Sequence, residues 1–431
     1  MNLYAVRVKL EGMLASFYKS WWFWPLFFGV FLRIVLSPIT YHPDILGHAS
    51  VTQFFVYEGI TNPYSYLSKL PQDHPLVANF GVSDIFIYPP LAYFTLGILR
   101  FLVSPFTSES FIPELWNNLS GIYDSSALFW HLFFFKLPYV FIDIFAGFFL
   151  AGLFSESRKK YQAFALWMFN PVTLYATFMM GQFDALPTLF VILGLYLIKL
   201  KKPTLGLLSL GIGGSFKMFP LLLIIPAALF LSQKTLPRIK LVLIGFLPFM
   251  LSILPYIFSP EFRQMVLFSP KNQKMLFMIL KMTSAEGIYI FVFVLSLLYL
   301  YSFYVRELRL WKVFLAILLL IFSVTHFHPQ WFLWASPLLI YELVTNRFAN
   351  SILVLVIFLS WVFITLTFEA SLSVGLFAPL NHKLSTTPGL EVLLGQHTDL
   401  PQLKSFVRSV FAACCAFLVY RNFISVKKDY A

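Results

Sequence analysis

Long apolar runs recur along almost the whole of this chain, from residue 21 to residue 423. A helix needs about 20 residues to cross roughly 30 Å of hydrocarbon, and the runs are long enough to do so. Because a backbone in lipid must satisfy its own hydrogen bonds, each crossing run is expected to be helical. The sequence therefore predicts an all-α, polytopic transmembrane helix bundle, and it excludes a soluble domain with a single anchor.

The composition supports a lipid environment. Hydrophobic residues make up 59% of the chain and charged residues only 12%, whereas charged residues supply about a quarter of a soluble domain. The formal charge of +12 does not indicate nucleic acid as a partner, because the basic residues stand in short clusters between the apolar runs. The two cysteines, Cys414 and Cys415, are adjacent and cannot build a disulfide framework or a cysteine metal site.

The basic clusters predict the topology through the positive-inside rule. Arg7, Lys9 and Lys19 precede the first apolar run, so we place the amino terminus in the cytoplasm and read a retained first helix. Threading onward gives about twelve spans with both termini cytoplasmic. Most of the 31 basic residues then fall inside and most of the 19 acidic residues outside. The first four spans are predicted at about residues 21–38, 129–154, 162–180 and 185–199.

Two long segments are predicted to lie outside the membrane, residues 39–128 as a first external loop and residues 369–404 as a late one. Within the first loop, residues 88–103 are apolar, but a full span there would place the basic cluster at 158–160 outside. We therefore predict an interfacial or re-entrant helix. The chain has neither a fixed-period repeat nor a long linker, so residues 1–431 are predicted to form a single membrane domain.

Polar side chains at the outer ends of the predicted spans are candidates for contact with a lipid head group. His42, Pro43 and Asp44 follow the first span, and His48 comes four residues later. Asp44 would be a general base on a turn that Pro43 makes rigid. The spacing equally allows Asp44 to be the N-cap of the following helix.

Two further charges stand where the chain is otherwise apolar. Asp184, after Gln182, would bind sugar hydroxyls or a cation, although turn and N-cap chemistry explain it as well. Lys217 is a lone cation in the apolar stretch 205–230. Such a charge costs about 2.5–3.5 kcal/mol at membrane depth, so it is expected to face a cavity or a partner such as a phosphate. The alternative is that Lys217 snorkels to the interface.

The last polar turn contains His326, His328, Gln330 and Trp331. Two imidazoles and an amide can grip a phosphate or a sugar through hydrogen bonds, with the indole as a stacking plate. Interfacial anchoring explains Trp331 equally well. Two histidines without a third ligand are insufficient for a metal site.

Two charges inside the predicted spans are assigned structural roles. Arg33, near the outer end of the first span, is interpreted as a snorkelling residue, with contact to a phosphate as the alternative. Asp143, in the middle of the second span, is expected to pair with Lys136 or with another helix.

Several segments occur in an order that is typical of one superfamily. A Trp-Xxx-Phe-Asn-Pro segment, an Asn/Gln-Xxx-Asp turn and a Lys-Xxx-Tyr/Phe-Pro segment follow one another, and three further segments look similar. Here they are Trp167–Pro171, Gln182–Asp184 and Lys217–Pro220, with Asn62–Tyr64, Tyr88–Leu91 and Pro329–Trp334. In these features the chain resembles the GT-C superfamily of membrane glycosyltransferases, and within it the catalytic subunit of GPI mannosyltransferase I and its prokaryotic relatives.

The resemblance implies a GT-C fold and an inverting glycosyltransferase. The enzyme would move a hexose, mannose before others, from a polyprenyl-phosphate-sugar donor to a lipid-linked or cell-surface glycan acceptor. The site would face outward from the plasma membrane. A transporter or flippase of lipid-linked sugars is the alternative, because it too needs buried charges facing a cavity. Repeated halves, which such transporters commonly show, are not found in this sequence. A third class, a structural partner of another membrane enzyme, would explain the fold but not Lys217 at membrane depth.

The resemblance also distributes roles over the candidate residues. Asp44 becomes the catalytic base, and Tyr88 joins the residues around the sugar. Relatives with Asp-Xxx-Asp at this turn differ from the His42-Pro43-Asp44 found here, so the need for Mg²⁺ or Mn²⁺ is left open, with Asp44, His42 and His48 as its candidate ligands. The donor phosphate would be bound by Lys217, His328 and Gln330, and the sugar or acceptor by Asp184, Gln182, Tyr88 and His42.

Overall fold

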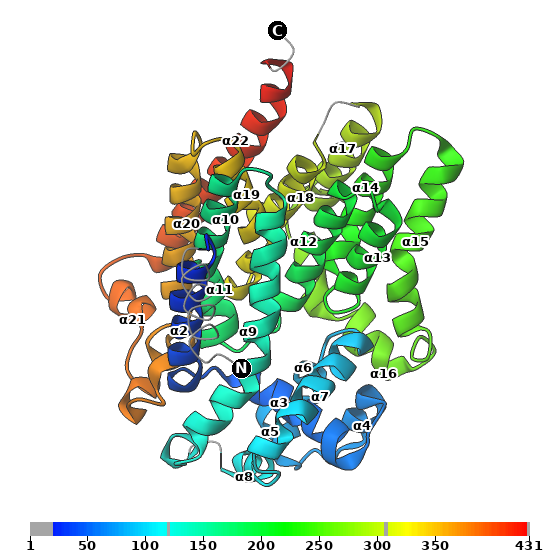
Figure 1. Cartoon of the computed structure of the whole chain (residues 1–431). Helices are drawn as coiled ribbons and strands as arrows, with labels where there is room; N and C mark the ends of the chain where they lie inside the picture. The colour runs from blue at the N-terminus through cyan, green and yellow to red at the C-terminus, as the bar shows by residue number, and fades with distance from the viewer. Residues whose placement is uncertain (1–19, 119–120, 306–308, 429–431) are drawn as a thin grey trace, which may run out of the picture.

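The computed structural model describes residues 20–118, 121–305 and 309–428, and these are almost entirely helical (Figure 1). Arg7, Lys9 and Lys19, which carried the prediction of a cytoplasmic amino terminus, lie outside the described residues. The one sheet in the described ranges is a hairpin of β1 (Ile279–Lys281) and β2 (Gly287–Tyr289), with Leu280 opposite Ile288. Apart from this hairpin, the predicted all-α fold is confirmed.

Three helices in the described part of the chain are long and apolar enough to cross a membrane: α9 (Leu128–Gly152), α15 (Thr235–Ile253) and α22 (Leu400–Lys428). Two sharply bent pairs raise the number to five if each is one span. The first pair is α2 (Phe23–Ile39) with α3 (Pro43–Glu58), bent by 84°. The second joins α7 (Pro90–Val103), continued to Phe106, to α8 (Phe111–Asn117) at 104°.

Shorter apolar helices of 10–17 residues account for most of the other predicted spans. They are α12 (Ala185–Lys199), α13 (Pro203–Gly214), η4 with α14 (Phe219–Leu223 and Ile224–Leu231), α17 (Ile290–Tyr304), α18 (Leu310–Val324) and α20 (Ser351–Leu366). The chain is thus a polytopic membrane protein with three to five candidate spans, short of the twelve predicted. The difference arises because Pro and irregular turns divide apolar runs that look continuous in sequence.

One divided run shows how this happens. The stretch predicted as a span at 162–180 is three pieces: α10 (Ser157–Met168), α11 (Pro171–Thr173) and the π-helical turn η3 (Leu174–Met179). Asn170 ends the first piece and caps the second, because its side chain accepts a hydrogen bond from the backbone N–H of Val172 at 3.0 Å. Pro171 cannot donate the hydrogen bond that would continue α10.

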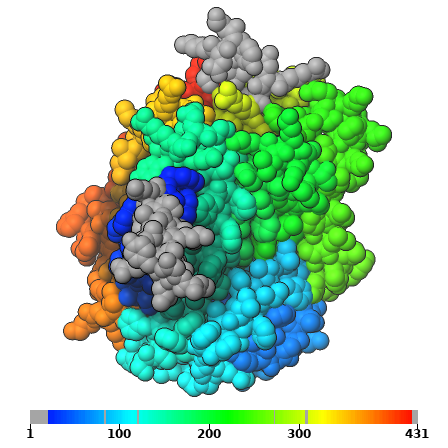
Figure 2. All heavy atoms as spheres, in the orientation of Figure 1, coloured from blue at the N-terminus to red at the C-terminus, as the bar shows by residue number. Residues whose placement is uncertain are grey.

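The predicted first external loop folds into short helices that gather at one end of the bundle, opposite the end of α22 (Figure 1). In the space-filling view they form a continuous mass across that end (Figure 2). α7 coincides with the predicted interfacial helix. The others are α3, α4 (Pro63–Lys69), α5 (Pro75–Phe80), α6 (Val82–Ile85) and α8. Proline at the first position starts α3, α4, α5 and α7, where a missing N–H costs nothing.

The late loop packs back onto the start of the first loop. It contains η8 (Ala370–Leu372), η9 (Val374–Phe377), η10 (His382–Ser385) and α21 (Leu390–Gly395). The backbone N–H of Tyr41 donates to the carbonyl of Leu376 at 2.8 Å. The Tyr175 hydroxyl donates to the carbonyl of Leu372 at 2.8 Å. The first bond holds the late loop against the turn between α2 and α3, and the second holds it against η3.

Buried charges fix α2 in the bundle. Arg33 is fully buried and its Nε donates to the Asp143 carboxylate at 2.7 Å, so the snorkelling interpretation is wrong. Asp143 pairs with another helix, α2, and not with Lys136. Lys136 instead binds carbonyls at the end of α2, those of Ser37 at 2.9 Å and Thr40 at 2.6 Å. It thereby satisfies acceptors that a helix end leaves open.

Exposed apolar side chains separate a lipid-facing shell from the centre. α18 is buried on all sides from Leu310 to Phe322, as expected for a helix enclosed by protein. α15, by contrast, exposes Leu236, Leu243 and Leu251. Contiguous exposed apolar surface of this kind indicates contact with lipid.

Candidate functional site

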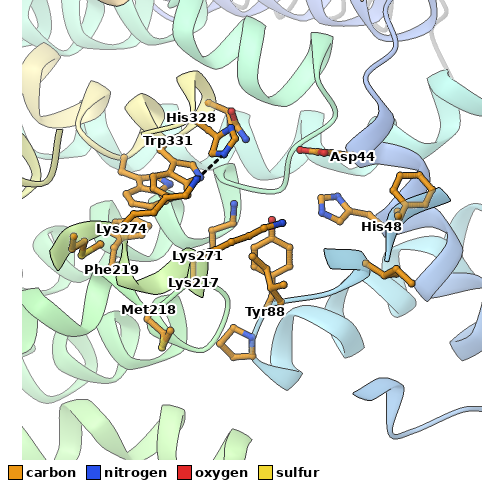
Figure 3. A pocket seen from close by; sticks show the side chains of 18 of the residues that line it. Asp44, His48, Tyr88, Lys217, Met218, Phe219, Lys271, Lys274, His328 and Trp331 are labelled. Carbon is orange, nitrogen blue, oxygen red and sulfur yellow. Dashed lines mark hydrogen bonds between the residues drawn. The ribbon is translucent and has the colours of Figure 1, made fainter. Parts of the chain in front are cut away.

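A cavity of about 300 Å³ lies where the short helices of the first loop meet the bundle (Figure 3). Its volume is at the lower end of the range for small-molecule sites. The apolar side chains on its wall come from α5, α6, η4, η6 (Pro270–Leu276) and η7 (Pro329–Trp334). The polar residues lining it are Asp44, His48, Tyr88, Lys217, Lys271, Lys274, His328 and Gln330.

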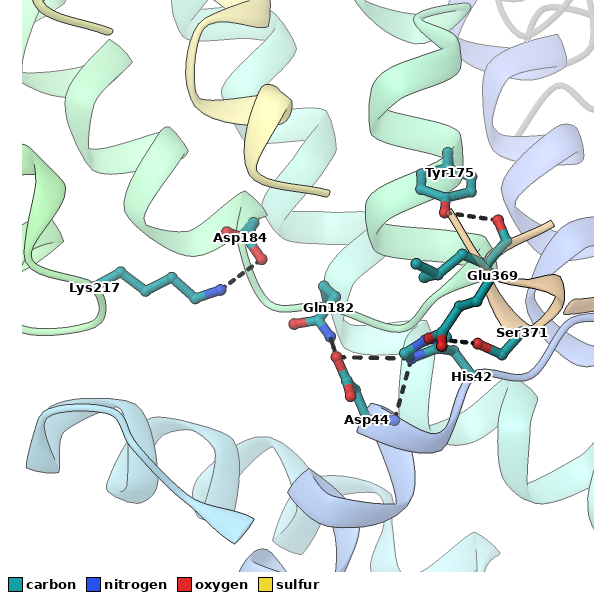
Figure 4. Close-up of polar contacts among 9 residues, drawn as sticks. His42, Asp44, Tyr175, Gln182, Asp184, Lys217, Glu369 and Ser371 are labelled. Atoms are coloured by element: carbon teal, nitrogen blue, oxygen red, sulfur yellow. Dashed lines mark hydrogen bonds and ion pairs between the residues drawn. The ribbon is translucent and has the colours of Figure 1, made fainter. Parts of the chain in front are cut away.

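Asp44 reaches the cavity from the first turn of α3. The N-cap of α3 is His42, whose Nδ1 accepts a hydrogen bond from the backbone N–H of Asp44 at 3.2 Å. Asp44 is therefore not the cap, which removes one of the two alternatives left by the sequence. Its side chain is 44% exposed, and Gln182 Nε2 donates to Asp44 Oδ2 at 2.5 Å (Figure 4). Gln182 and His42 thus fix the position of the turn that contains Asp44, although neither of them lines the cavity.

Lys217 is held on the wall by a buried ion pair. Its Nζ donates to Asp184 Oδ2 at 2.7 Å, and the two side chains are 7% and 0% exposed (Figure 4). Lys217 also lies 4.9 Å from the ring centre of Tyr88 and 4.6 Å from that of Phe183, distances at which a cation and an aromatic face attract. Snorkelling is excluded, because the ammonium group is enclosed and paired.

Asp184 stands behind the cavity and does not line it. Its second oxygen accepts a hydrogen bond from Trp334 Nε1 at 2.5 Å. It occupies the N-cap position of α12, but its side chain makes no capping hydrogen bond. Asp184 therefore positions two wall residues, Lys217 and Trp334, and the predicted contact with a sugar has no support in this geometry.

Two lysines on η6 add positive charge that the sequence analysis missed. Lys274 Nζ lies 3.1 Å from His328 Nε2 and 5.8 Å from the ring centre of Trp331. Lys271 lines the cavity beside it. The available signal was this pair of basic residues in the loop that follows the seventh predicted span, which the threading places outside, where the positive-inside rule expects few basic residues.

His328 belongs to the connection between α18 and η7. Its burial disfavours the charged imidazolium and Lys274 repels it, and together they lower the pKa of His328 to about 4. The ring is therefore neutral near pH 7 and its Nε2 can accept the hydrogen bond of Lys274. In the same segment Gln330 is buried, and no described residue donates a hydrogen bond to its Oε1. An amide oxygen left open on a cavity wall is an acceptor for ligand hydroxyls.

Stacked rings form the wall beside these groups. Trp331 stacks on Trp334 with ring centres 5.2 Å apart, and Trp334 stacks on Phe219 at 4.2 Å. Such a face suits the apolar side of a sugar ring or a lipid segment. Figure 3 shows Asp44 and His48 across the cavity from Trp331, His328 and Lys274.

The structure brings together most of the candidates drawn from the sequence. Asp44 and Lys217 open onto one cavity, as predicted, although they are far apart in the chain. His42, Gln182 and Asp184 lie behind the wall. The cavity residues from the candidate set are Asp44, His48, Tyr88, Lys217, His328 and Gln330.

Charge and ligand count indicate what the cavity can hold. Its lining contains three lysines and one carboxylate, that of Asp44, so an anionic ligand is favoured. In the described part of the chain no three or more His, Cys, Asp or Glu side chains group to hold a metal ion. His42, Asp44 and His48, the candidate ligands for Mg²⁺ or Mn²⁺, therefore do not form such a site.

Comparison with known families decides between the classes of protein that could use this cavity. The model of the family described as GPI transamidase subunit PIG-U matches residues 94–335, more than half of the chain. The chain belongs to the PIG-U family. A search of curated proteins found no match. PIG-U is distantly related to GPI mannosyltransferase-like proteins of the GT-C superfamily, which accounts for the resemblance in the sequence.

Family membership corrects the predicted function. GPI transamidase attaches GPI anchors to proteins, and PIG-U is described as a subunit of it, not as a mannosyltransferase. The predicted transfer of mannose from a polyprenyl-phosphate donor is therefore wrong. The flippase alternative is not supported either. The error arose because the motifs mark a scaffold that both families share, and a scaffold does not specify a reaction.

Proposed function

We propose that this chain is the glycolipid-binding subunit of a membrane complex of the GPI transamidase type. The cavity would hold the phosphate-bearing glycan head of the anchor, and other subunits would carry out the attachment to protein. The observation that carries the proposal is the composition of the cavity wall, which combines three ammonium groups, hydrogen-bonding side chains and stacked aromatic rings.

The cationic side of the cavity suits a phosphodiester. Lys271 and Lys274 lie on η6, and the Lys274–His328 contact orients the second ammonium group. Hydrogen bonds to charged groups contribute about 1.5–3 kcal/mol each. Lys217 adds a third ammonium group, whose position is fixed and whose charge is balanced by Asp184. A phosphate of the glycolipid therefore has several cationic donors within one wall.

The opposite side suits the sugars. There the Asp44 carboxylate is an acceptor for hydroxyl hydrogens, and Tyr88 also lines the cavity. The Gln330 amide oxygen, in the same segment as His328, is a second acceptor. We assign Asp44 a binding role in place of the catalytic one expected from the sequence. The apolar residues Ile85, Met218 and Met275 would lie against the start of the lipid.

The lining of the cavity argues for binding without catalysis by this chain. Transamidation needs a nucleophile to take over the acyl group, and Ser, Thr or Cys side chains usually serve. None of these residue types lines the cavity in the described part of the chain. Cys414 and Cys415 lie on α22, outside the lining. The nucleophile would therefore come from another subunit.

Family membership also bears on the location and organisation of the chain. PIG-U is a protein of the endoplasmic reticulum membrane, and we place this chain there in place of the plasma membrane predicted from the sequence. We keep one prediction as part of the proposal, that residues 1–431 form one membrane domain. We add that short apolar helices joined end to end complete further spans. Other GPI transamidase subunits and the GPI lipid are the proposed partners.

Binding by cavity variants tests the proposal. The chain in lipid nanodiscs should bind a GPI-type glycolipid, and the double variant Lys271→Gln/Lys274→Gln should bind it at least about tenfold more weakly, corresponding to about 1.4 kcal/mol. Lys383→Gln, at an exposed position of the late loop, is the matched control and should bind like the wild type. Equal affinity of the double variant and the wild type would refute the cavity as the binding site.

A cellular measurement tests membership in the complex. In cells without their own PIG-U, the chain should restore surface display of a GPI-anchored reporter, and Lys271→Gln/Lys274→Gln should restore less of it. Failure of the wild-type chain to restore any display, at normal membrane expression, would count against its role as a transamidase subunit.

A further inference from the structure

Arg100 is a buried cation that the proposed function does not use. It lies in the last turn of α7 and is 5% exposed. Its Nη1 donates to Thr107 Oγ1 at 2.7 Å, and its guanidinium carbon lies 4.4 Å from the ring centre of Phe135. No described residue accepts a hydrogen bond from its Nε or Nη2. Two of its nitrogens are thus buried without a partner.

A second cavity, of about 40 Å³, lies beside this side chain between α3, α7 and α9. Its volume is about three times the 10–15 Å³ that one water molecule needs, which leaves room for a small oxyanion. The lining contains Arg100, His48 and Thr52 but neither Asp nor Glu among the described residues. The Nδ1 of His48 is also buried, and no described group hydrogen-bonds to it.

The environment of Arg100 is unfavourable as it stands. A buried charge is normally paired and hydrogen-bonded, because desolvation otherwise outweighs its attractions. The ring of Phe135 and the carbonyl end of α7 offset part of this cost. Neither of them accepts a hydrogen bond from Nε or Nη2 of Arg100. A guanidinium group presents its donors as a planar fork that matches the oxygens of a phosphate.

We infer that the cavity at Arg100 is a second anion site, which binds a phosphate group of a phosphomonoester or phosphodiester. The guanidinium fork would hold two oxygens of the phosphate, and a ring N–H of His48 would donate to a third. The site is separate from the main cavity but shares His48 with it. The phosphate could come from a lipid head group or from free phosphate, and the test distinguishes the two.

The experiment measures melting temperature in two settings. In the first, the purified full chain in lipid-free detergent is titrated with inorganic phosphate at constant ionic strength. In the second, it is placed in nanodiscs of a phosphate-free galactolipid with or without phosphatidic acid. We expect a rise in melting temperature with phosphate, with phosphatidic acid, or with both, and we expect Arg100→Met to abolish it. A response to phosphatidic acid alone identifies a lipid head group.

Two further variants keep the outcome clear. Lys271→Gln/Lys274→Gln should retain the Arg100-dependent rise, which separates this site from the main cavity and from the proposed function. Arg100→Lys keeps the charge but lacks the fork, so it should lower the apparent phosphate affinity at least tenfold even if Arg100→Met does not fold. A rise of equal size in Arg100→Lys and the wild type, or no rise with either probe, would overturn the inference.

Discussion

The ion pair of Lys217 and Asp184 offers the sharpest quantitative prediction. Both side chains are buried, and the Asp184 carboxylate is also bound by Trp334. Breaking a buried pair by removing one partner costs about 3–5 kcal/mol, because the other charge stays buried and uncompensated. Lys217→Met and Asp184→Asn should each lower the free energy of unfolding by about this amount.

The double variant separates the pair from its individual members. Lys217→Met/Asp184→Asn removes both charges, and the Asn amide oxygen can still accept the hydrogen bond of Trp334. Replacing a whole buried pair by neutral groups is often close to neutral. The double variant should therefore be more stable than either single variant. This requires a coupling energy larger than the loss in one single variant, above about 3 kcal/mol and thus beyond the range of about 0.5–3 kcal/mol usual for contacting residues.

Reversible unfolding in mixed detergent micelles measures all four proteins of this cycle. Glycolipid binding should stay weak in the double variant, because the cavity has lost one ammonium group although the fold has recovered. Additive losses in the two single variants, with no recovery in the double variant, would refute the view that Asp184 serves to position Lys217.

Three further predictions concern stability. Burial keeps His328 neutral in the folded state, with its pKa lowered to about 4. The unfolded chain therefore binds the extra proton first, and stability should fall as the pH drops from about 6.5 to 4, less so in His328→Gln, in melting experiments. A Cβ at Gly211 would lie 2.0 Å from the carbonyl oxygen of Gly245, so Gly211→Ala should cost at least about 1–3 kcal/mol in detergent unfolding. Gly395→Ala, where nothing lies within 4 Å, should change little. Lys136→Met removes the hydrogen-bond donor of the carbonyls at the end of α2. In the same assay it should lower the free energy of unfolding by about 1–3 kcal/mol for each acceptor left without a partner.

Part of the fold and of the site could be predicted from local physical chemistry. The range 185–199 coincides with α12. An apolar run bounded by a turn and a basic cluster is expected to form one helix in a membrane, and the turn and the cluster mark its two ends. Lys217 was expected to find a partner, because a lone charge among apolar residues is costly. Asp44 and Lys217 were expected to meet, and they line one cavity.

Other features depend on tertiary structure that the sequence pattern does not carry. Lys271 and Lys274 look like solvated residues of a loop until η6 folds them against His328. In an isolated helix the Arg33 side chain could reach the membrane–water interface. In the bundle it is buried and hydrogen-bonded to the Asp143 carboxylate. The function was mistaken for a related reason, because the motifs describe the shared scaffold and not the chemistry done on it.

The most direct test of the account is to map where the glycolipid lies. A GPI analogue with a photoreactive group next to its phosphate is added to membranes that contain the chain, irradiated, and the modified peptides are sequenced. The account predicts crosslinks in η6, around Lys271 and Lys274, and in the segment from His328 to Trp331, which excess unlabelled glycolipid prevents. Crosslinks confined to the lipid-facing sides of α15 and α22, unchanged by competitor, would contradict it.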